Sequence, residues 1–400
     1  PAWVVRHTCL KRKNYNIRLN QVTMTQSITI DIFNKRLSGI QSTLEEMVNL
    51  ESPTTDKAAV DRLGDSIRTL CEQAGGKTRI LPSETSGNKI VVNWGGKEGG
   101  FLILCHMDTV FDLGTLKTRP FRESEGRLTG PGVLDMKAGI AIFLSVMQWM
   151  HETGIQPSMP LTVLFSADEE TGSQTSKDTI IEMASKSSLV LCLEPALANG
   201  ALKTARKGTG EIKLRVSGLA AHAGSNHKDG RNAIEELAHH VLSAQKLTDY
   251  DRGTTVNTGL IGGGTRVNVV PDEAWADLDF RVAEMDEVKR LQAWADGLRS
   301  HIEGTSVSAT LSLDRPPMPR NALMQQTFTK ASQFAAGIGL QLTEGSTGGG
   351  SDANFVSQLN VPVLDGLGGV GDGAHSDREY VLRDSLAERA ALLAALLTNW

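Results

Sequence analysis

Hydrophobic positions along the chain alternate between helical spacing and short strand-like runs. Residues 28–50 and 56–74 carry apolar side chains at helical intervals, and the second segment ends at Gly75-Gly76. Strand-like runs follow at 77–81, 89–94, 101–105, 161–165 and 189–193, with helical patterns at 138–151 and 177–185. Strands that alternate with helices predict an α/β domain whose sheet is mostly parallel and is covered on both faces.

The middle of the chain follows a different order of elements. Strand patterns occur at 211–217, 254–261, 267–270 with 274–282, and 307–313, and helical patterns at 232–247 and 286–303. This β-α-β-β-α-β order is the ferredoxin-like arrangement. The α/β pattern then resumes, with helices at 322–336 and 385–397 and a strand at 361–364. The sequence therefore predicts an α+β domain (209–316) inserted between two parts of the α/β domain (24–208 and 317–400).

Composition narrows the class of protein. The 400 residues are 40% hydrophobic and 22% charged, which is typical of a soluble globular chain of two domains. The net charge of -5 gives no basic surface for nucleic acid, and no run reaches the roughly 18 apolar residues of a membrane span. The four cysteines (Cys9, Cys71, Cys105 and Cys192) lie far apart and form no CxxC pair. We expect reduced thiols, a cytoplasmic protein, and neither nucleic acid nor membrane as a partner.

Residues 1–23 differ from the rest of the chain. They begin with Pro1 and contain basic side chains at positions 6, 11, 12, 13 and 18 but no acidic one. The segment has no apolar central region of a signal peptide and no clear cleavage site. We interpret it as a non-native or disordered leader, and Met24 as the start of the ordinary sequence.

Polar residues with metal-binding side chains follow several of the predicted strands. In α/β sheets, ligands bind beyond the carboxyl ends of the strands. The residues at these ends are His106, Asp108, Asp168, Glu169, Glu170 and Glu194, with Asp135 after a Gly130-Pro131-Gly132 turn and His375 after a Gly-rich loop. Any one of them alone is typical of an ordinary loop, but loops do not explain their recurrence at successive strand ends.

The types of side chain favour a catalytic metal centre. Imidazoles and carboxylates without thiolates suit zinc, with cobalt or manganese as alternatives. His106 and Asp108 are two residues apart and face the same way in an extended segment, so Asp108 can hold the second nitrogen of His106. Cys105 is an alternative as a thiol nucleophile, but it points away from His106. Two metals about 3.5–4 Å apart would need a bridging carboxylate.

Seven short motifs, taken together and in order, resemble those of a known enzyme family. They are His106-Met107-Asp108-Thr109-Val110, Gly130-Pro131-Gly132 through Asp135-Met136-Lys137, Asp168 through Ser173, Glu194-Pro195, Ala221-His222-Ala223-Gly224, Gly348 through Asp352 and His375-Ser376. From Leu50 to its end, the chain resembles the dinuclear zinc peptidases that include bacterial glutamate carboxypeptidase, aminoacylase and succinyl-diaminopimelate desuccinylase. The glutamate carboxypeptidase branch is the most similar. The resemblance implies a phosphorylase/hydrolase-like catalytic domain with an inserted lid domain that forms a homodimer.

The resemblance also implies a role for each site residue. One zinc would be held by His106, Asp135 and Glu194, and the other by Asp135, Glu170 and His375, with Asp135 as the bridge. Glu169 would be the general base that takes a proton from the attacking water and passes it to the leaving nitrogen. The family usually has a cis peptide after the bridging aspartate, here Asp135–Met136, and Met136 replaces an aspartate that is common there.

Substrate recognition is implied in the same way. Arg281 matches a carboxylate clamp, since a guanidinium grips a carboxylate with two hydrogen bonds. Asn268 and the backbone of Gly349 and Gly350 would assist it. His222 matches a residue that reaches the partner subunit's active site and stabilises the oxyanion of the tetrahedral intermediate.

We therefore expect zinc-dependent hydrolysis of an amide bond next to a free carboxylate. The enzyme would release a C-terminal amino acid, with glutamate as one candidate, from an N-acyl or peptidyl substrate. In this family, glutamate at position 194 tends to accompany carboxypeptidases and deacylases. An N-acyl-amino-acid deacylase and a non-catalytic binding protein are the alternatives. An aminopeptidase would need an anchor for a substrate ammonium group, and the sequence identifies none.

Overall fold

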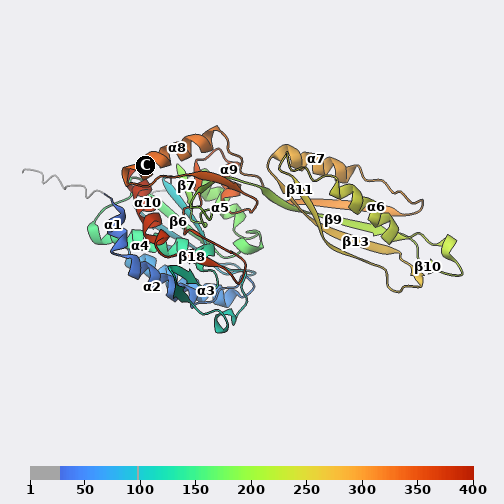
Figure 1. Ribbon diagram of the computed structural model, residues 1–400, viewed down its shortest axis with the longest axis horizontal. Coiled ribbons are helices and arrows are strands. Elements are labelled where there is room, and N and C mark those ends of the chain that lie inside the picture. The colour runs from blue at the N-terminus through green and yellow to red at the C-terminus, as the bar shows by residue number, and fades with distance from the viewer. Residues whose placement is uncertain (1–27, 97–98) are drawn as a thin grey trace, which may run out of the picture.

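The larger domain is built around an eight-stranded sheet. The computed structural model describes residues 28–96 and 99–400 (Figure 1), so the predicted leader, residues 1–23, lies outside the described residues. The strand order is β1-β2-β6-β3-β7-β16-β8-β15. The strands are β1 (Lys77–Leu81), β2 (Lys89–Trp94), β3 (Phe101–His106), β6 (Leu161–Ser166), β7 (Leu189–Cys192), β8 (Leu202–Arg206), β15 (Glu344–Thr347) and β16 (Val363–Asp365). The pairs β3–β6, β3–β7, β7–β16 and β8–β15 are parallel, which confirms the predicted mostly parallel sheet.

Helices bury both faces of this sheet. They are α1 (Ile30–Asn34), α2 (Leu37–Val48), α3 (Lys57–Gln73), α4 (Ala138–Thr153), α5 (Lys177–Ser185), α8 (Ala322–Gly337), α9 (Ala353–Ser357) and α10 (Ser385–Asn399). Ile103 of β3 belongs to the core that includes α4 and α10, whereas its neighbours Leu102 and Leu104 belong to a second core with α5 and α9. Alternate residues of one strand thus face opposite layers, which explains its continuous apolar run.

The helix α4 forms the centre of the larger core. The segment Val133–Thr153 is long and apolar enough to cross a membrane, but 89% of its most apolar window is buried inside the domain, as in a core helix. Gly139 lets α4 approach the sheet closely, because a Cβ atom there would overlap the carbonyl oxygen of Leu193. The helix therefore packs directly against the strand end that precedes Glu194.

Two predicted helices differ from those in the structure. The predicted helix at 28–50 is divided into α1 and α2 by a turn at Lys35-Arg36. The predicted helix at 286–303 ends at Asp296, and a loop follows. The buried carboxylate of Glu236 accepts hydrogen bonds from the backbone N–H groups of His301 and Ile302 in that loop. These donors are therefore satisfied by a distant side chain, which a helical periodicity does not reveal.

A small second sheet was not predicted from the sequence. It has the order β17-β18-β5-β4, with β4 (Arg122–Ser124), β5 (Arg127–Thr129), β17 (Gly371–Asp372) and β18 (Tyr380–Leu382). The loop between β17 and β18 carries His375, and β5 leads into the Gly130-Pro131-Gly132 turn. This sheet therefore brings His375 to the turn that carries Asp135.

The lid domain comprises residues 208–315 and projects from the catalytic domain (Figure 1). Its antiparallel strands β9 (Gly208–Ser217), β11 (Thr255–Gly263), β13 (Glu273–Val282) and β14 (Ser306–Arg315) have the order β11-β13-β9-β14. The helices α6 (Ala233–Gln245) and α7 (Met285–Asp296) pack on one face, in the predicted β-α-β-β-α-β order. Where the lid joins the catalytic domain, Arg315 at the end of β14 pairs with Thr209 near the start of β9.

Candidate metal centre and active site

The first group of metal ligands lies at the carboxyl ends of β3 and β7. His106 ends β3, Glu194 follows β7, and Asp135 lies in the irregular turn η2 (Val133–Lys137) just before α4. The Nε2 atom of His106 is 3.1 Å from Oδ1 of Asp135 and 3.6 Å from Oε1 of Glu194. Their ligand atoms all lie within 4.8 Å of one another.

The second group shares Asp135 with the first. Glu170 lies in the short 3-10 helix η3 (Glu169–Thr171) that follows β6. The Nε2 atom of His375 is 3.0 Å from Oε2 of Glu170 and 3.4 Å from Oδ2 of Asp135. The two oxygens of Asp135 therefore face one histidine each, as a bridging carboxylate requires. The structure thus brings together all five metal ligands named from the sequence.

The buried carboxylates of this cluster fit divalent cations. Burial, together with the negative charge of Asp135, raises the pKa of Glu194 to about 7. Burial also raises the pKa of Glu170, whose Oε1 atom is enclosed and has no hydrogen-bond partner among the described residues. Hydrogen bonds to Asp135 and Glu170 raise the pKa of His375 to about 11. Imidazoles and carboxylates form the donor set of catalytic dinuclear centres, so these side chains fit two divalent cations.

The orientation of His106 depends on backbone as well as side-chain contacts. Its Nδ1 atom is 2.9 Å from the backbone oxygen of Asp108 and 3.5 Å from the carboxylate oxygen Oδ1. The fully buried Asp108 carboxylate accepts hydrogen bonds from the hydroxyl of Thr54 (2.7 Å) and the backbone N–H groups of Glu169 (3.3 Å) and Glu170 (3.2 Å). Asp108 therefore positions three residues of the site, whereas the sequence predicted only its contact with His106.

Glu379 shapes the turn around the bridging aspartate, and sequence reasoning missed it. Its buried carboxylate accepts hydrogen bonds from the backbone N–H groups of Gly132 (2.9 Å), Leu134 (2.9 Å) and Asp135 (3.0 Å). The peptide bond between Asp135 and Met136 is cis, as the family resemblance implies. Glu379 comes from a distant part of the chain, and no local motif identifies it.

The predicted general base Glu169 contacts an arginine that the sequence did not single out. The Nη2 atom of Arg315 is 2.7 Å from the carboxylate oxygen Oε1 of Glu169. The side chain of Arg315 is buried and that of Glu169 is mostly buried, with exposed fractions of 6% and 11%. Burial raises the pKa of Glu169 well above its usual range, against the opposing charge of Arg315. A buried carboxylate with a raised pKa is typical of a catalytic acid or base.

Arg206 supports the Glu194 side of the site and was also missed. Its guanidinium forms an ion pair with Asp365 and lies 3.3 Å from Oε2 of Glu194. Its Nη1 atom donates to the carbonyl oxygens of Gly349 (3.2 Å) and Gly350 (2.9 Å). The Gly349-Gly350 loop, predicted to assist substrate binding, is thus held near the metal ligands by a buried cation.

A pocket of about 650 Å3 adjoins the metal ligands. Glu169, Glu170, His375, Gly350 and Arg281 are among the residues that line it. The predicted carboxylate clamp and the predicted base therefore face one pocket. Arg281 is half-exposed and bonds the carboxylate of Asp279 on the same strand, with Nη2 at 2.8 Å from Oδ2.

The remaining two predicted residues lie elsewhere in this chain. His222 is in β10 (Ala221–His222), and Asn268 precedes β12 (Val269–Val270), with which β10 pairs. Their segments are joined by a hydrogen bond from the N–H group of Ala223 to the carbonyl of Asn268. Figure 1 places β10 at the end of the lid farthest from the catalytic domain. A single chain therefore does not bring His222 or Asn268 to its own metal ligands.

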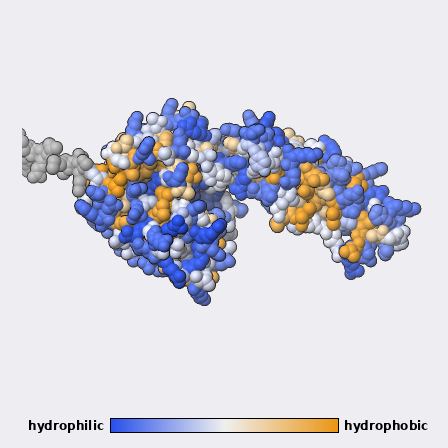
Figure 2. All heavy atoms as spheres, viewed as in Figure 1, coloured by the Kyte–Doolittle hydropathy of each residue, from blue (hydrophilic) through white to orange (hydrophobic). Residues whose placement is uncertain are grey.

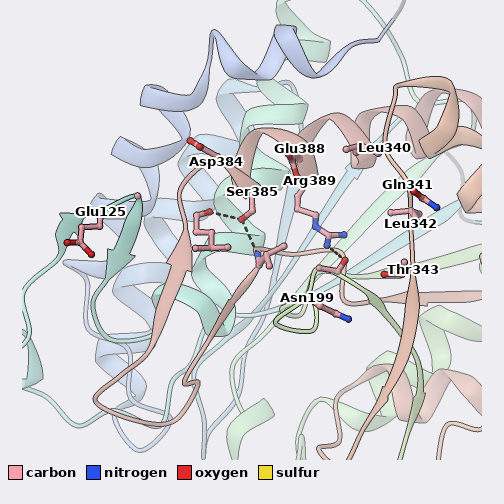
Figure 3. A pocket seen from close by; sticks show the side chains of 14 residues that line it. Glu125, Asn199, Leu340, Gln341, Leu342, Thr343, Asp384, Ser385, Glu388 and Arg389 are labelled. Carbon is pink, nitrogen blue, oxygen red and sulfur yellow. Dashed lines mark hydrogen bonds between the residues drawn. The ribbon is translucent and has the colours of Figure 1, made fainter.

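A separate pocket of about 460 Å3 contains none of the predicted site residues (Figure 3). It lies between the start of α10, the β4–β5 turn and residues 340–343. Arg389 extends from α10 and donates a hydrogen bond to the carbonyl of Gly200. Its Nη1 atom is enclosed and finds no partner in the described part of the chain. We therefore assign the chemistry to the pocket beside Glu169 and Arg281.

The motifs and the geometry agree with a family model. Residues 102–399 match the model of peptidase family M20/M25/M40, a span that contains every predicted metal ligand. The chain belongs to this family. The M20 match makes this protein a hydrolytic peptidase or amidohydrolase, and the two clusters around Asp135 could each hold a metal ion.

Several known proteins are similar over most of the chain. Carboxypeptidase G2 of Pseudomonas sp. (strain RS-16) is 29% identical, and the alignment covers 99% of this chain and 94% of that protein. Succinyl-diaminopimelate desuccinylase of Rhodospirillum centenum is 25% identical, and the alignment covers 86% of this chain and 92% of that protein. The crystal structure of aminopeptidase PepT from Bacillus cereus has a TM-score of 0.73 at 19% identity. The superposition covers 90% of this chain and 98% of that chain. These M20 relatives support metal-dependent amide hydrolysis, while the last similarity shows only a shared fold.

Proposed function

We propose that this M20 protein is a zinc-dependent carboxypeptidase that releases a C-terminal amino acid from an N-acyl or peptidyl substrate. The observation that carries the proposal is the position of Arg281 in the pocket that also contains Glu169 and His375. A guanidinium there can hold the substrate's free carboxylate while the neighbouring amide faces the metal ligands. The similarity to carboxypeptidase G2 over 99% of the chain supports this specificity, with glutamate as the first candidate for the released residue.

The side chains of the site divide the reaction between them. Two divalent ions held by the five ligands would polarise the scissile carbonyl and lower the pKa of a water molecule between them. Glu169 takes the proton of the attacking water and delivers it to the leaving nitrogen. Arg281 binds the carboxylate of the departing amino acid, so that its amide nitrogen stays close to Glu169.

A deacylase is the second candidate function. The similarity to succinyl-diaminopimelate desuccinylase, which covers 86% of this chain, favours it. The reaction is the same amide hydrolysis, but a deacylase recognises the acyl group more strongly than the amino acid. The two functions therefore differ in which half of the substrate must be kept for turnover.

The test is amino-acid release from a substrate panel by the zinc-loaded protein. The panel contains folate-type and peptidyl glutamates, N-acetyl and N-succinyl amino acids, and dipeptides. We expect cleavage of substrates with a free α-carboxylate and a loss of activity after chelation, which zinc restores, with about two zinc ions per chain by elemental analysis. Inactivity on the whole panel with two zinc ions bound would refute the proposed specificity.

We further propose that the protein acts as a homodimer in which His222 serves the partner subunit's active site. The position of β10, which contains His222, at the far end of the lid supports this role (Figure 1). Large apolar side chains are exposed in the same domain, with exposed fractions of 62% for Leu260, 61% for Ile261 and 54% for Leu219. Hydrophobic surface is visible along the lid in Figure 2. Contiguous exposed apolar surface commonly marks a protein interface.

Mixing two inactive variants tests this arrangement. His222→Ala and Glu169→Gln are expected to be nearly inactive alone, because each removes a catalytic group from both sites of the dimer. In a mixed dimer, one site receives an intact His222 and an intact Glu169, so random re-assortment should recover about a quarter of the wild-type activity. The measurement is activity after mixing under exchange conditions, with dimer mass checked by light scattering. No recovery from mixtures that contain mixed dimers would exclude a role in trans.

A further inference from the structure

Arg315 forms an unusually complete set of contacts with the predicted base. Its Nη2 atom donates to the carboxylate oxygen Oε1 of Glu169 at 2.7 Å and also to the backbone carbonyl oxygen of Glu169 at 2.8 Å. One nitrogen thus bridges the main chain and the side chain of the same residue, which restricts the side-chain torsions of Glu169. Among the described residues, none donates a hydrogen bond to the second carboxylate oxygen, Oε2, so that atom can receive a proton.

Arg315 is itself held from several sides. Its guanidinium bonds the hydroxyl of Ser173, with nitrogens at 3.1 and 3.2 Å, and the carboxylate of Asp352 at 3.3 Å. The ring of Phe355 lies 5.2 Å from its central carbon. A planar group with five donors suits such a network, and a lysine ammonium does not reproduce it. Arg315 therefore lacks the freedom of a surface side chain, and its position determines where Oε1 of Glu169 lies.

Arg315 also connects the lid to the catalytic domain. Arg315 is the last residue of β14, at the junction between the lid and the catalytic domain, and pairs with Thr209 of β9. Gly350 lies beside it, since a Cβ atom at Gly350 would come within 2.7 Å of Cδ of Arg315. A movement of the lid that displaces the end of β14 must therefore move or break the contact with Glu169.

We propose that Arg315 is a positioning residue that fixes the carboxylate of Glu169 and links its orientation to the lid strand β14. This inference rests on the proposed function, in which Glu169 is the base. Arg315 acts through Glu169 and not by binding the substrate, which is the task of Arg281. A displacement of about 1 Å in a catalytic group can lower the rate by about 100-fold, so loss of Arg315 should slow turnover more than it weakens binding.

The test compares Arg315→Gln and Arg315→Lys with a matched control, Arg320→Gln. Arg320 lies just beyond the junction and forms a surface ion pair with Glu344. We expect both Arg315 variants to lower kcat by about 10- to 100-fold, with KM within about twofold and two metal ions retained. Added guanidinium ion should restore part of kcat in Arg315→Ala. A raised KM at unchanged kcat, or kinetics equal to those of Arg320→Gln, would overturn the proposal.

A readout without catalysis separates this proposal from the proposed function. If the zinc-loaded wild-type protein cleaves nothing, the proposed function fails, and hydrogen exchange still tests the contact. In the metal-loaded protein, Arg315→Gln should speed backbone exchange in residues 169–173 relative to Arg320→Gln, because the link to the Glu169 carbonyl and the Ser173 hydroxyl is lost. Equal exchange in the two variants would show that Arg315 does not hold this segment.

Discussion

Glu169→Gln is expected to lower kcat by about 1000-fold or more while both metal ions stay bound. The substitution keeps the shape of the side chain and its capacity to accept a hydrogen bond from Arg315, but an amide cannot take the proton of the attacking water. The buried carboxylate at this position has a raised pKa and is not among the five clustered metal ligands. The measurements are steady-state rates on the best panel substrate and elemental analysis of the purified variant.

Glu170→Gln is the matched control for this prediction. The two glutamates are adjacent in η3, but only Glu170 belongs to the cluster with Asp135 and His375. Glu170→Gln should therefore lower metal content as well as activity, since a carboxylate ligand is lost. An active Glu169→Gln enzyme, or one that loses metal to the same extent as Glu170→Gln, would remove Glu169 from the role of base.

The metal ligands could be predicted because the fold places them by a simple rule. His106, Glu170 and Glu194 follow neighbouring parallel strands, and parallel strands bring their carboxyl ends to one edge of the sheet. The apolar runs that locate these strands are continuous because both faces of the sheet are buried. The strand ends therefore indicated His106, Glu170 and Glu194 as candidates. The family resemblance selected the five ligands from all the candidates and assigned Asp135 as the bridge.

The residues that support these ligands were not predictable in the same way. Glu379 reaches the Asp135 turn from more than 240 positions away, and Arg315 reaches Glu169 across 146 positions. Neither residue stands in a motif of its own sequence neighbourhood. The role of Glu379 arises from the small β4-β5-β17-β18 sheet, which hydrophobic periodicity did not identify. The sequence did locate the junction of the lid near Arg315, but not the contact that Arg315 makes there with Glu169.

The trans role proposed for His222 could not be derived from the geometry of one chain. The family resemblance implied a catalytic function for His222, yet β10, which contains it, lies at the far end of the lid (Figure 1). The segment of Asn268 is hydrogen-bonded to that of His222, since its carbonyl accepts from the N–H group of Ala223. His222 and Asn268 can reach metal ligands only if a second copy of the chain supplies them to its partner's site. The sequence of one chain does not reveal such a contact between subunits.

Arg281→Ala is expected to raise KM for carboxylate substrates by about 10- to 100-fold, because a charge-assisted hydrogen-bond pair contributes about 1.5–3 kcal/mol. The effect on kcat should be small, since the grip is equally strong before and during the chemical step. In the structure the Arg281 guanidinium donates hydrogen bonds to the carboxylate of Asp279. A substrate carboxylate must compete with Asp279 for this guanidinium. Asp279→Asn should therefore lower KM or leave it unchanged.

A substrate whose terminal carboxylate is replaced by a neutral amide makes the test specific to one contact. Wild type should hydrolyse the amidated substrate poorly, and Arg281→Ala should reduce its hydrolysis no further, because the interaction is already absent. If Arg281→Ala lowered kcat/KM for the carboxylate and the amidated substrate by the same factor, Arg281 would act on the protein and not on the substrate carboxylate. The proposed carboxypeptidase specificity would then have to rest on another cation of the pocket, such as Lys177.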